Sequence, residues 1–117
     1  MSASELVIVG AGPAGIAAAI TAHRAGLTVT VIDKATFPRD KCCGDGLTAL
    51  ALRELEHLGF DGRGLTSWET IRDVALRSPA GREITMQLPA DAGLFSAVVR
   101  RNELDNALVD HASSLGV

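Results

Sequence analysis

The chain has 117 residues, and 47% of them are hydrophobic, which provides enough apolar surface for the core of one α/β domain. A net charge of −3, with three Phe, one Trp and no Tyr, gives neither an electrostatic nor a base-stacking basis for binding nucleic acid. No apolar run is long enough for a membrane span, and the first residues lack the basic start of a signal peptide. Two adjacent cysteines do not make the disulfide framework of a secreted domain. A cytoplasmic location is therefore expected.

The first elements predicted in chain order form a βαβ unit. Residues 5–9, ELVIV, are apolar and mostly β-branched, and we expect them to form a buried parallel strand. An Ala-rich helix is expected from Pro13 and is ended by Gly26. Residues 28–32, TVTVI, predict a second strand that ends at Asp33. This order indicates the α/β class with a parallel sheet.

The turn between the first strand and the helix carries a glycine motif. Gly10, Gly12 and Gly15 form G-x-G-x-x-G, with Pro13 and Ala14 between the last two glycines. The first glycine permits the tight turn, the second lets the backbone approach a pyrophosphate, and the third lets helix and strand pack closely. The helix N-terminus offers unpaired N–H groups to the phosphates. The motif predicts a Rossmann-like site for an ADP-containing dinucleotide, FAD or NAD, and a plain structural turn is the alternative.

An acidic residue closes the second strand where such sites bind ribose. Asp33 can accept hydrogen bonds from both hydroxyls of an adenosine ribose. Its charge would repel a 2′-phosphate, which argues against NADP at this site. Lys34, the next residue, is included among the predicted cofactor-binding residues. The prediction of a dinucleotide site is much more specific than the glycines alone would allow, because the strand, the glycine turn, the helix and the terminal acid follow in the expected order.

The remaining elements depart from the short α/β alternation of a nicotinamide dehydrogenase. After an irregular loop, we expect a helix over 47–58, a hairpin from 71–78 and 83–88, a strand over 95–99 and a last helix over about 101–114. The hairpin is therefore an insertion in the α/β domain. Gly116 resembles a helix C-cap followed by the first residue of another strand. We expect residues 1–117 to be the N-terminal part of a dinucleotide-binding domain, incomplete at its C-terminus and without the substrate domain.

Two further segments resemble one flavoprotein family. The segment 38-PRDKCCGDGL-47 resembles the P-R-x-K-x-C-G-x-G-L motif of the geranylgeranyl reductase family, which is related to the p-hydroxybenzoate hydroxylase class. The segment 100-RRNELDNALVDHA-112 is similar to that class, with Arg-x-x-Leu-Asp opening a helix. The resemblance spans nearly the whole chain, and it is closest to the bacterial branch that includes menaquinone reductases.

The resemblance implies FAD as the cofactor and NAD(P)H as the electron donor, bound away from the glycine-rich motif. Cys43 matches the motif cysteine, and the loop formed by Cys43, Gly44, Asp45 and Gly46 is expected to run near the isoalloxazine ring. The two glycines would allow unusual backbone dihedrals and a close approach. Cys43 is a candidate catalytic residue, either as a proton donor or as a residue that shapes the substrate end of the pocket.

The resemblance also places two arginines near the cofactor. Arg101 matches the family arginine that approaches the FAD phosphate or ribityl region, and Arg39 is expected to pair with flavin phosphates or with substrate. A cation at a helix start is not favoured by the helix dipole, and this conflict favours an anionic partner for Arg101. The alternatives are a surface arginine at the start of a helix for Arg101 and a solvated loop charge for Arg39.

The cysteine loop has other interpretations. Cys43 could be an adaptable packing residue, and we interpret Cys42, at the variable position of the motif, as structural. A vicinal disulfide is strained and disfavoured in the cytosol, and no second Cys/His cluster supports a metal site. The C-x4-C pattern of the flavin disulfide reductases is absent, so dithiol chemistry is not expected. Asp45 could simply cap the helix that starts near Gly46.

The function implied by the resemblance is the reduction of carbon–carbon double bonds in an isoprenoid chain. Reduced flavin would deliver a hydride equivalent to one carbon, and a proton would reach the other. A flavin monooxygenase acting on an aromatic substrate is the second candidate, and a halogenase is third because Cys-Gly-Asp replaces its usual Gly-Glu-Ser. A nucleotide-binding module without turnover is the non-enzyme alternative. A peripheral membrane association of the full-length protein is left open.

Overall fold

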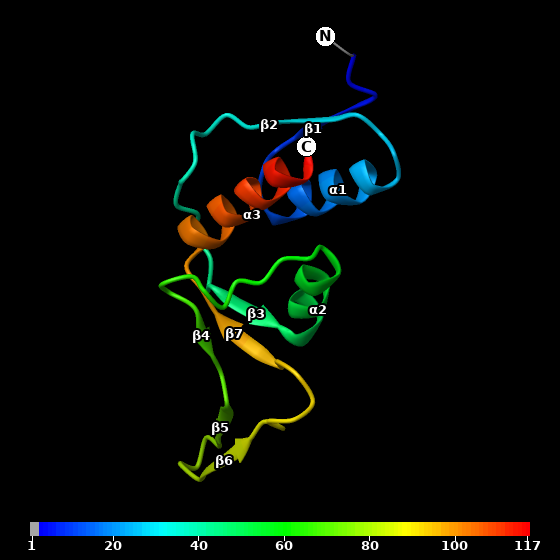
Figure 1. Cartoon of the computed structure of the whole chain (residues 1–117). Coiled ribbons are helices and arrows are strands. Elements are labelled where there is room, and N and C mark those ends of the chain that lie inside the picture. The colour runs from blue at the N-terminus through cyan, green and yellow to red at the C-terminus, as the bar shows by residue number, and fades with distance from the viewer. Residues whose placement is uncertain (1–2) are drawn as a thin grey trace.

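The computed structural model describes residues 3–117, which form three helices and seven strands. The bounds are β1 Leu6–Val9, α1 Pro13–Arg24, β2 Val29–Ile32, β3 Gly46–Thr48, α2 Ala49–His57, β4 Glu69–Thr70, β5 Asp73–Arg77, β6 Glu83–Gln87, β7 Ser96–Val98 and α3 Arg101–Leu115. Figure 1 shows α1 and α3 with β1 and β2 at one end, the β5–β6 hairpin at the other end, and α2 with the remaining strands between them. The predicted α/β class, with a parallel βαβ unit and an inserted hairpin, is confirmed.

Among residues 3–117, no helix combines the length and apolar character needed to cross a membrane.

The βαβ unit forms where the sequence predicted it. β1 and β2 pair in parallel, beginning with Leu6 opposite Val29. Pro13 opens α1, where its fixed φ suits the helix and its missing N–H leaves no helical bond unmade. Gly26, with φ of +95°, then turns the chain toward β2. α1 is therefore the crossover that two parallel strands require.

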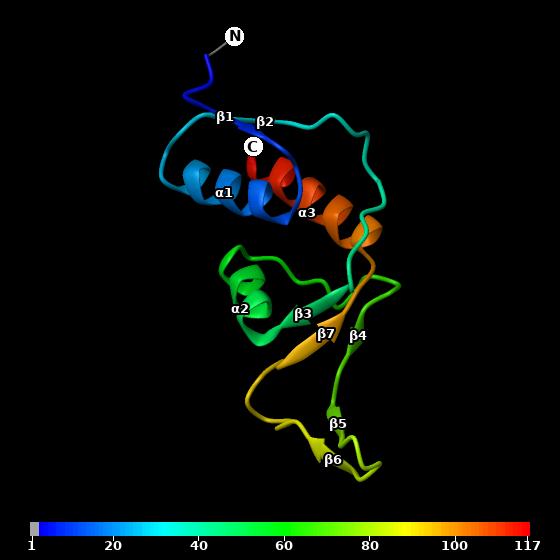
Figure 2. The ribbon, with the colours of Figure 1, turned by 180° about the vertical axis from the view of Figure 1, so that it is seen from behind.

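The hydrophobic core lies mainly between α1 and α3, which lie side by side in the opposite views of Figures 1 and 2. Ile20 of α1 and Leu108 of α3 are 0% and 1% exposed. The other buried members of the cluster are Ala11, Ile16, Leu58, Val99, Leu104 and Ala112. The members on α1 and α3 are spaced four residues apart, at positions 16 and 20 and at positions 104, 108 and 112, which places them on one face of each helix. α3 ends as predicted at Gly116, which has the left-handed φ of +100°.

The second helix begins later than predicted and has a different cap. The sequence predicted a helix over 47–58 with Asp45 as a candidate cap, but Gly46–Thr48 forms β3, which pairs antiparallel with β7. β7 also pairs with β4, which completes a sheet of order β3-β7-β4. Thr48 is the N-cap of α2, and its Oγ1 accepts a hydrogen bond from the backbone N–H of Ala51 at 3.2 Å. Pairing with a distant strand therefore outweighs the local helical pattern at this point.

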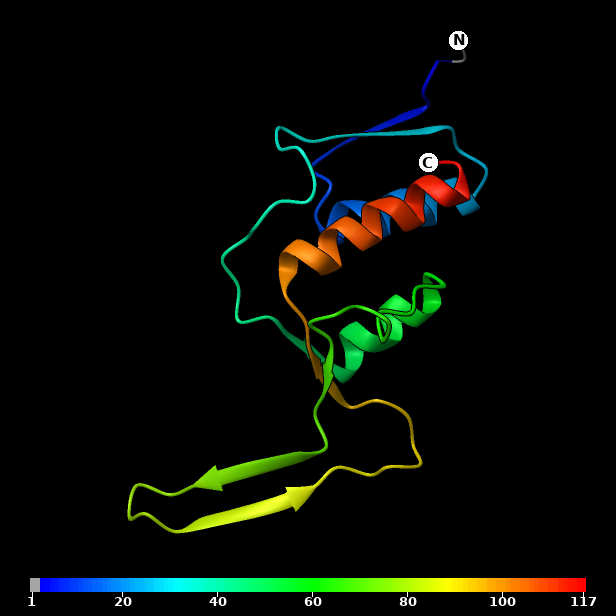
Figure 3. The ribbon, with the colours of Figure 1, turned by 60° about the vertical axis from the view of Figure 1, so that its left-hand side comes forward.

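The predicted hairpin is confirmed and extends away from the helices (Figure 3). In β5 and β6, Val74 lies opposite Met86 and Leu76 lies opposite Ile84. These four side chains share one face because successive residues of a strand alternate between faces. They are 37–58% exposed, so the hairpin adds no buried residue to the core.

The first strand is parallel as expected, but the expectation that it is buried is wrong. Val7 and Val9 are 54% and 81% exposed, and Ile32 of β2 is 49% exposed. Within residues 3–117 the parallel sheet has two strands, and α1 packs against one face of it. The apolar side chains of the other face therefore have no cover, and burial alternates along β1 as it does in a half-covered sheet.

Candidate functional site

The glycine turn has a backbone that other residues would not adopt easily. Gly10 has φ of +107°, and its N–H donates to the carbonyl oxygen of Ile32 at 2.7 Å. A Cβ at Gly15 would lie 1.8 Å from the carbonyl oxygen of Gly10, so glycine is needed for α1 to approach the turn this closely. Gly12 is the N-cap of α1 and offers no side chain to the first helical N–H groups. These groups and the helix dipole can bind an anion at this end of α1.

Asp33 is bonded to the glycine turn. Its Oδ2 accepts a hydrogen bond from the backbone N–H of Ala11 and its Oδ1 accepts one from Ala35, both at 2.8 Å. These two bonds, followed by the positive charges of Arg39 and Lys34, hold the pKa of the Asp33 carboxyl below its ordinary value. Each carboxylate oxygen has a second acceptor site. Asp33 can therefore hold the turn and still accept hydrogen bonds from the hydroxyls of a ligand.

Arg39 and Arg101 meet at one buried carboxylate, that of Asp105. Arg39 Nη1 donates to Asp105 Oδ2 at 2.6 Å, and Arg101 donates from Nε to Oδ1 and from Nη2 to Oδ2, both at 2.8 Å. The Asp105 side chain is 0% exposed, whereas those of Arg39 and Arg101 are 17% and 18% exposed. Hydrogen bonding to Asp105, and then to Cys43, raises the pKa of the Arg101 guanidinium. Asp105 belongs to the Arg-x-x-Leu-Asp motif but was not among the predicted site residues, although its i, i+4 spacing from Arg101 is a signal for such a pair.

The cysteine loop carries two free, exposed thiols, those of Cys42 and Cys43. A hydrogen bond from the Asp45 backbone N–H, and then the guanidinium of Arg101, lower the pKa of the Cys43 thiol. The loop is anchored to the end of β7 because the Val99 N–H donates to the Asp45 carbonyl at 3.0 Å. Within residues 3–117, no group of His, Cys, Asp and Glu side chains is placed to hold a metal ion.

The unusual dihedral of this loop belongs to Asp45 and not to the neighbouring glycines. Asp45 has φ of +58°, a left-handed conformation that Asp tolerates better than most residues. Gly44 and Gly46 do not have positive φ, so the expectation of unusual dihedrals there is wrong. A Cβ at Gly44 would meet nothing within 4 Å. The backbone on this side of the loop is therefore open to approach by a ligand.

A mainly apolar cavity of about 320 Å³ brings three of the predicted segments together. Pro13 and Ala14 at the start of α1, Cys43 with Asp45 and Gly46, and Arg101 at the start of α3 all line it. The other lining residues are Ala17, Leu47, Ala51, Glu54, Leu55, Leu58, Val99, Leu104 and Leu108. Asp33, Lys34 and Arg39 do not line this cavity. It therefore joins the glycine turn to the cysteine loop.

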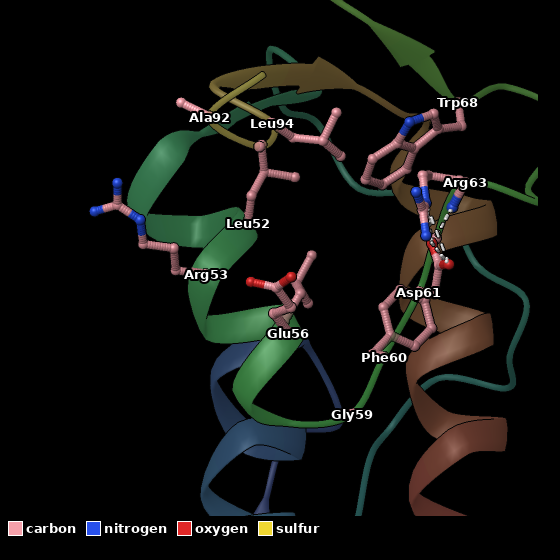
Figure 4. A pocket seen from close by; sticks show the side chains of 13 residues that line it. Leu52, Arg53, Glu56, Gly59, Phe60, Asp61, Arg63, Trp68, Ala92 and Leu94 are labelled. Atoms are coloured by element: carbon pink, nitrogen blue, oxygen red, sulfur yellow. Dashed lines mark hydrogen bonds and ion pairs between the residues drawn. The ribbon is translucent and has the colours of Figure 1, made fainter. Parts of the chain in front are cut away.

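A second cavity, of about 390 Å³, contains none of the predicted site residues. Figure 4 shows α2 on one side of it and Phe60, Trp68 and the Asp61–Arg63 ion pair on the other. Hydrogen bonding to Arg63 lowers the pKa of the Asp61 carboxyl to about 2. The Trp68 ring lies so close to Gly62 that a Cβ there would be 2.6 Å away, so Trp68 is a packing residue.

Known proteins resemble this chain along nearly its whole length. A family profile described as pyridine nucleotide-disulphide oxidoreductase matches residues 4–88. A menaquinone reductase of Mycobacterium tuberculosis is 47% identical over 115 residues, which cover 97% of this chain and 28% of that protein. A digeranylgeranylglycerophospholipid reductase of Methanosarcina mazei is 32% identical over 113 residues, which cover 96% of this chain and 27% of that protein.

The fold is also similar to that of solved flavoprotein structures. A flavin-dependent brominase superposes with a TM-score of 0.78 at 28% sequence identity, covering 97% of this chain and 28% of the brominase. The chain thus spans less than a third of the length of the curated relatives that it matches.

Proposed function

The chain belongs to the pyridine nucleotide-disulphide oxidoreductase family of FAD-dependent oxidoreductases, and on that premise we propose that it forms part of a reductase of carbon–carbon double bonds in isoprenoid chains. The observation that carries the proposal is the cavity where the glycine turn, the Cys43 loop and Arg101 meet. Mainly apolar walls with a few polar groups suit a hydrocarbon substrate placed beside a polar cofactor. Similarity to a menaquinone reductase and a digeranylgeranylglycerophospholipid reductase supports the substrate class.

Disulfide chemistry does not follow from the family's name. Cys42 and Cys43 are adjacent free thiols, and the C-x4-C pattern of disulfide reductases is absent from the sequence. Two adjacent thiols form only a strained disulfide. We therefore assign the redox step to the flavin and not to a cysteine pair.

FAD fits the residues present on three counts. The turn at Gly10 admits no Cβ at Gly15, the start of α1 has no side chain on its first N–H groups, and Asp33 keeps acceptor sites for a ribose. We propose that the cofactor is held by Gly10, Gly12, Pro13, Ala14, Gly15, Asp33, Lys34, Arg39, Cys43, Gly44, Asp45, Gly46 and Arg101. When bound, FAD supplies the hydride equivalent for the reduction.

Cys43 is the proposed proton source for the second carbon of the double bond. Cys43 is one of the residues that line the cavity. The Asp45 N–H and the Arg101 guanidinium stabilise the thiolate that remains after the proton leaves, which makes the thiol a stronger acid. Because the thiol form disappears as the pH rises through this lowered pKa, the rate of reduction is expected to fall over the same pH range.

NAD(P)H is the electron donor that we propose, and it binds outside the glycine turn because that turn holds the FAD. Substrates with long isoprenoid chains partition into membranes. We therefore include a peripheral membrane contact of the full-length protein in the proposal.

The experiment measures anaerobic turnover of a menaquinone with an unsaturated polyprenyl chain by the full-length protein. NADH or NADPH is the reductant, and mass spectrometry detects a product with two added hydrogens. Cys43→Ser is expected to slow this reaction about 100-fold or more, the usual contribution of a general acid. The neighbouring Cys42→Ser is the matched control and is expected to keep the rate.

Other outcomes of this experiment would identify the alternatives. A hydroxylated aromatic product formed only with oxygen would contradict the reductase and favour the monooxygenase. Binding of FAD without turnover of either substrate would favour the nucleotide-binding module. An unchanged rate in Cys43→Ser would remove the proton-donor role while leaving the reductase intact.

A further inference from the structure

Among residues 3–117, Asp105 is the only buried polar or charged residue. Its carboxylate accepts three hydrogen bonds from Arg39 and Arg101. A carboxylate has about four acceptor sites, so these donors nearly saturate it. A buried carboxylate without such partners would be strongly unfavourable. Both guanidinium groups are therefore held where this carboxylate lies.

The two arginines connect Asp105 to the two halves of the proposed site. Arg39 comes from the loop after β2, and its Cζ lies 4.8 Å above the centroid of the Phe37 ring. Its Nη2 lies 3.7 Å from the position that a Cβ of Gly12 would take, which places it at the glycine turn. Arg101, at the start of α3, lines the cavity together with Cys43. One buried group thus contacts residues from both ends of the site.

The charges of this cluster do not cancel. Two guanidinium groups share one carboxylate, which leaves a net positive charge beside the start of α1. Arg101 also lies at the N-terminus of α3, where the helix dipole disfavours a cation. Asp105, one turn further along α3, offsets that conflict through the paired hydrogen bonds to Arg101.

We infer that Asp105 is a positioning residue that holds Arg39 at the glycine turn and Arg101 beside the Cys43 loop. The inference deepens the proposed function and depends on it only for the identity of the ligand that the arginines meet. The competing interpretation is an ion pair that anchors α3 and has no effect on where Arg101 lies relative to Cys43.

The test uses the Cys43 thiol as a reporter of the position of Arg101. The rate of alkylation by iodoacetamide is measured against pH in the Cys42→Ser protein without added FAD, because the thiolate is the reacting form. Asp105→Asn removes the charge, and Asp105→Glu keeps the charge but displaces it by one methylene. Circular dichroism verifies that each variant is folded. Asp61→Asn, which breaks the exposed pair with Arg63, is the matched control and is expected to leave the midpoint unchanged.

Positioning and simple electrostatics predict opposite results. If Asp105 positions Arg101, the guanidinium leaves the thiol in Asp105→Asn, and the pH midpoint of alkylation rises. If Asp105 acts only through its charge, removal of a nearby negative charge lowers the midpoint. A midpoint in Asp105→Asn that falls or stays the same would overturn the inference.

If Asp105→Asn does not fold, two further measurements test whether Asp105 positions the arginines. In that case a raised midpoint in Asp105→Glu supports positioning, and an unchanged one contradicts it. If neither variant folds, hydrogen exchange of the guanidinium groups is measured in the otherwise unaltered protein. Slow exchange in both Arg39 and Arg101 supports positioning, and fast exchange in either contradicts it.

The alkylation experiment requires no cofactor. A failure to bind FAD would therefore refute the proposed function without affecting this result. Unchanged midpoints in a protein that does bind FAD would refute the positioning role alone.

Discussion

Single hydrogen bonds at the candidate site connect segments that are distant in the sequence. Asp33 joins the glycine turn to the chain after β2 through Ala11 and Ala35. Because its pKa is lower in the folded protein than in the unfolded chain, the ionised carboxylate stabilises the fold. This contribution is fully present above the unfolded pKa, near 3.8, and is lost as the pH falls through the lower folded pKa.

We expect Asp33→Asn to lower the free energy of unfolding at neutral pH, because one amide oxygen replaces two charged acceptors. The difference from the unaltered protein should shrink once the pH falls below about 3.8, since the carboxyl of the unaltered protein is then being protonated. Urea unfolding across this pH range measures both effects. Asp73→Asn, on the exposed hairpin, is the control and should show no such trend. A difference that persists undiminished in acid would contradict the linkage.

The residues of the site differed in how well the sequence predicted their contacts. The strand-to-turn position of Asp33 and the motif position of Arg101 are local signals, and they led to both residues being named. Asp105 was missed because its bond to Arg39 spans 66 positions and exists only after the loop and α3 come together. The left-handed φ of Asp45 was also missed, since the adjacent glycines are the usual residues for that conformation.

At the scale of elements, the close approach of α1 to the turn before it depends on Gly15. We expect Gly15→Ala to destabilise the βαβ unit, because the new methyl would lie 1.8 Å from a backbone oxygen that cannot rotate away. Overpacking of this kind costs about 1–3 kcal/mol. Gly44→Ala is the matched control, since its methyl would meet nothing within 4 Å and its φ is not positive. Denaturant unfolding compares the two variants, and equal stabilities would contradict the close packing of α1.

The longer elements were predictable because their signals are local. Apolar spacing and a glycine C-cap defined α3, and alternation around a turn defined the hairpin. The strands β3 and β4 were missed because each has two or three residues and exists through its pairing with β7. Leu47 opposite Ala97 is such a pair, and no local pattern could indicate it.

At the scale of the whole molecule, buried and exposed apolar residues lie in different places. The core lies around α1 and α3, whereas one face of the hairpin and one face of β1 and β2 expose large apolar side chains. The sequence predicted the α/β class and the order of the main elements. It could not predict the burial of β1, because a strand's apolar composition does not say how many neighbouring strands or helices cover it.

FAD binding is tested most directly by the visible absorption spectrum of the purified full-length protein before and after incubation with FAD. We predict the bands of bound flavin in the unaltered protein and their loss in Gly15→Ala, where the new methyl disrupts the proposed pyrophosphate site. A protein that stays colourless after incubation with FAD and instead binds NAD would contradict FAD as the cofactor of the glycine turn. It would also remove the flavin-related roles proposed for Cys43 and Arg101.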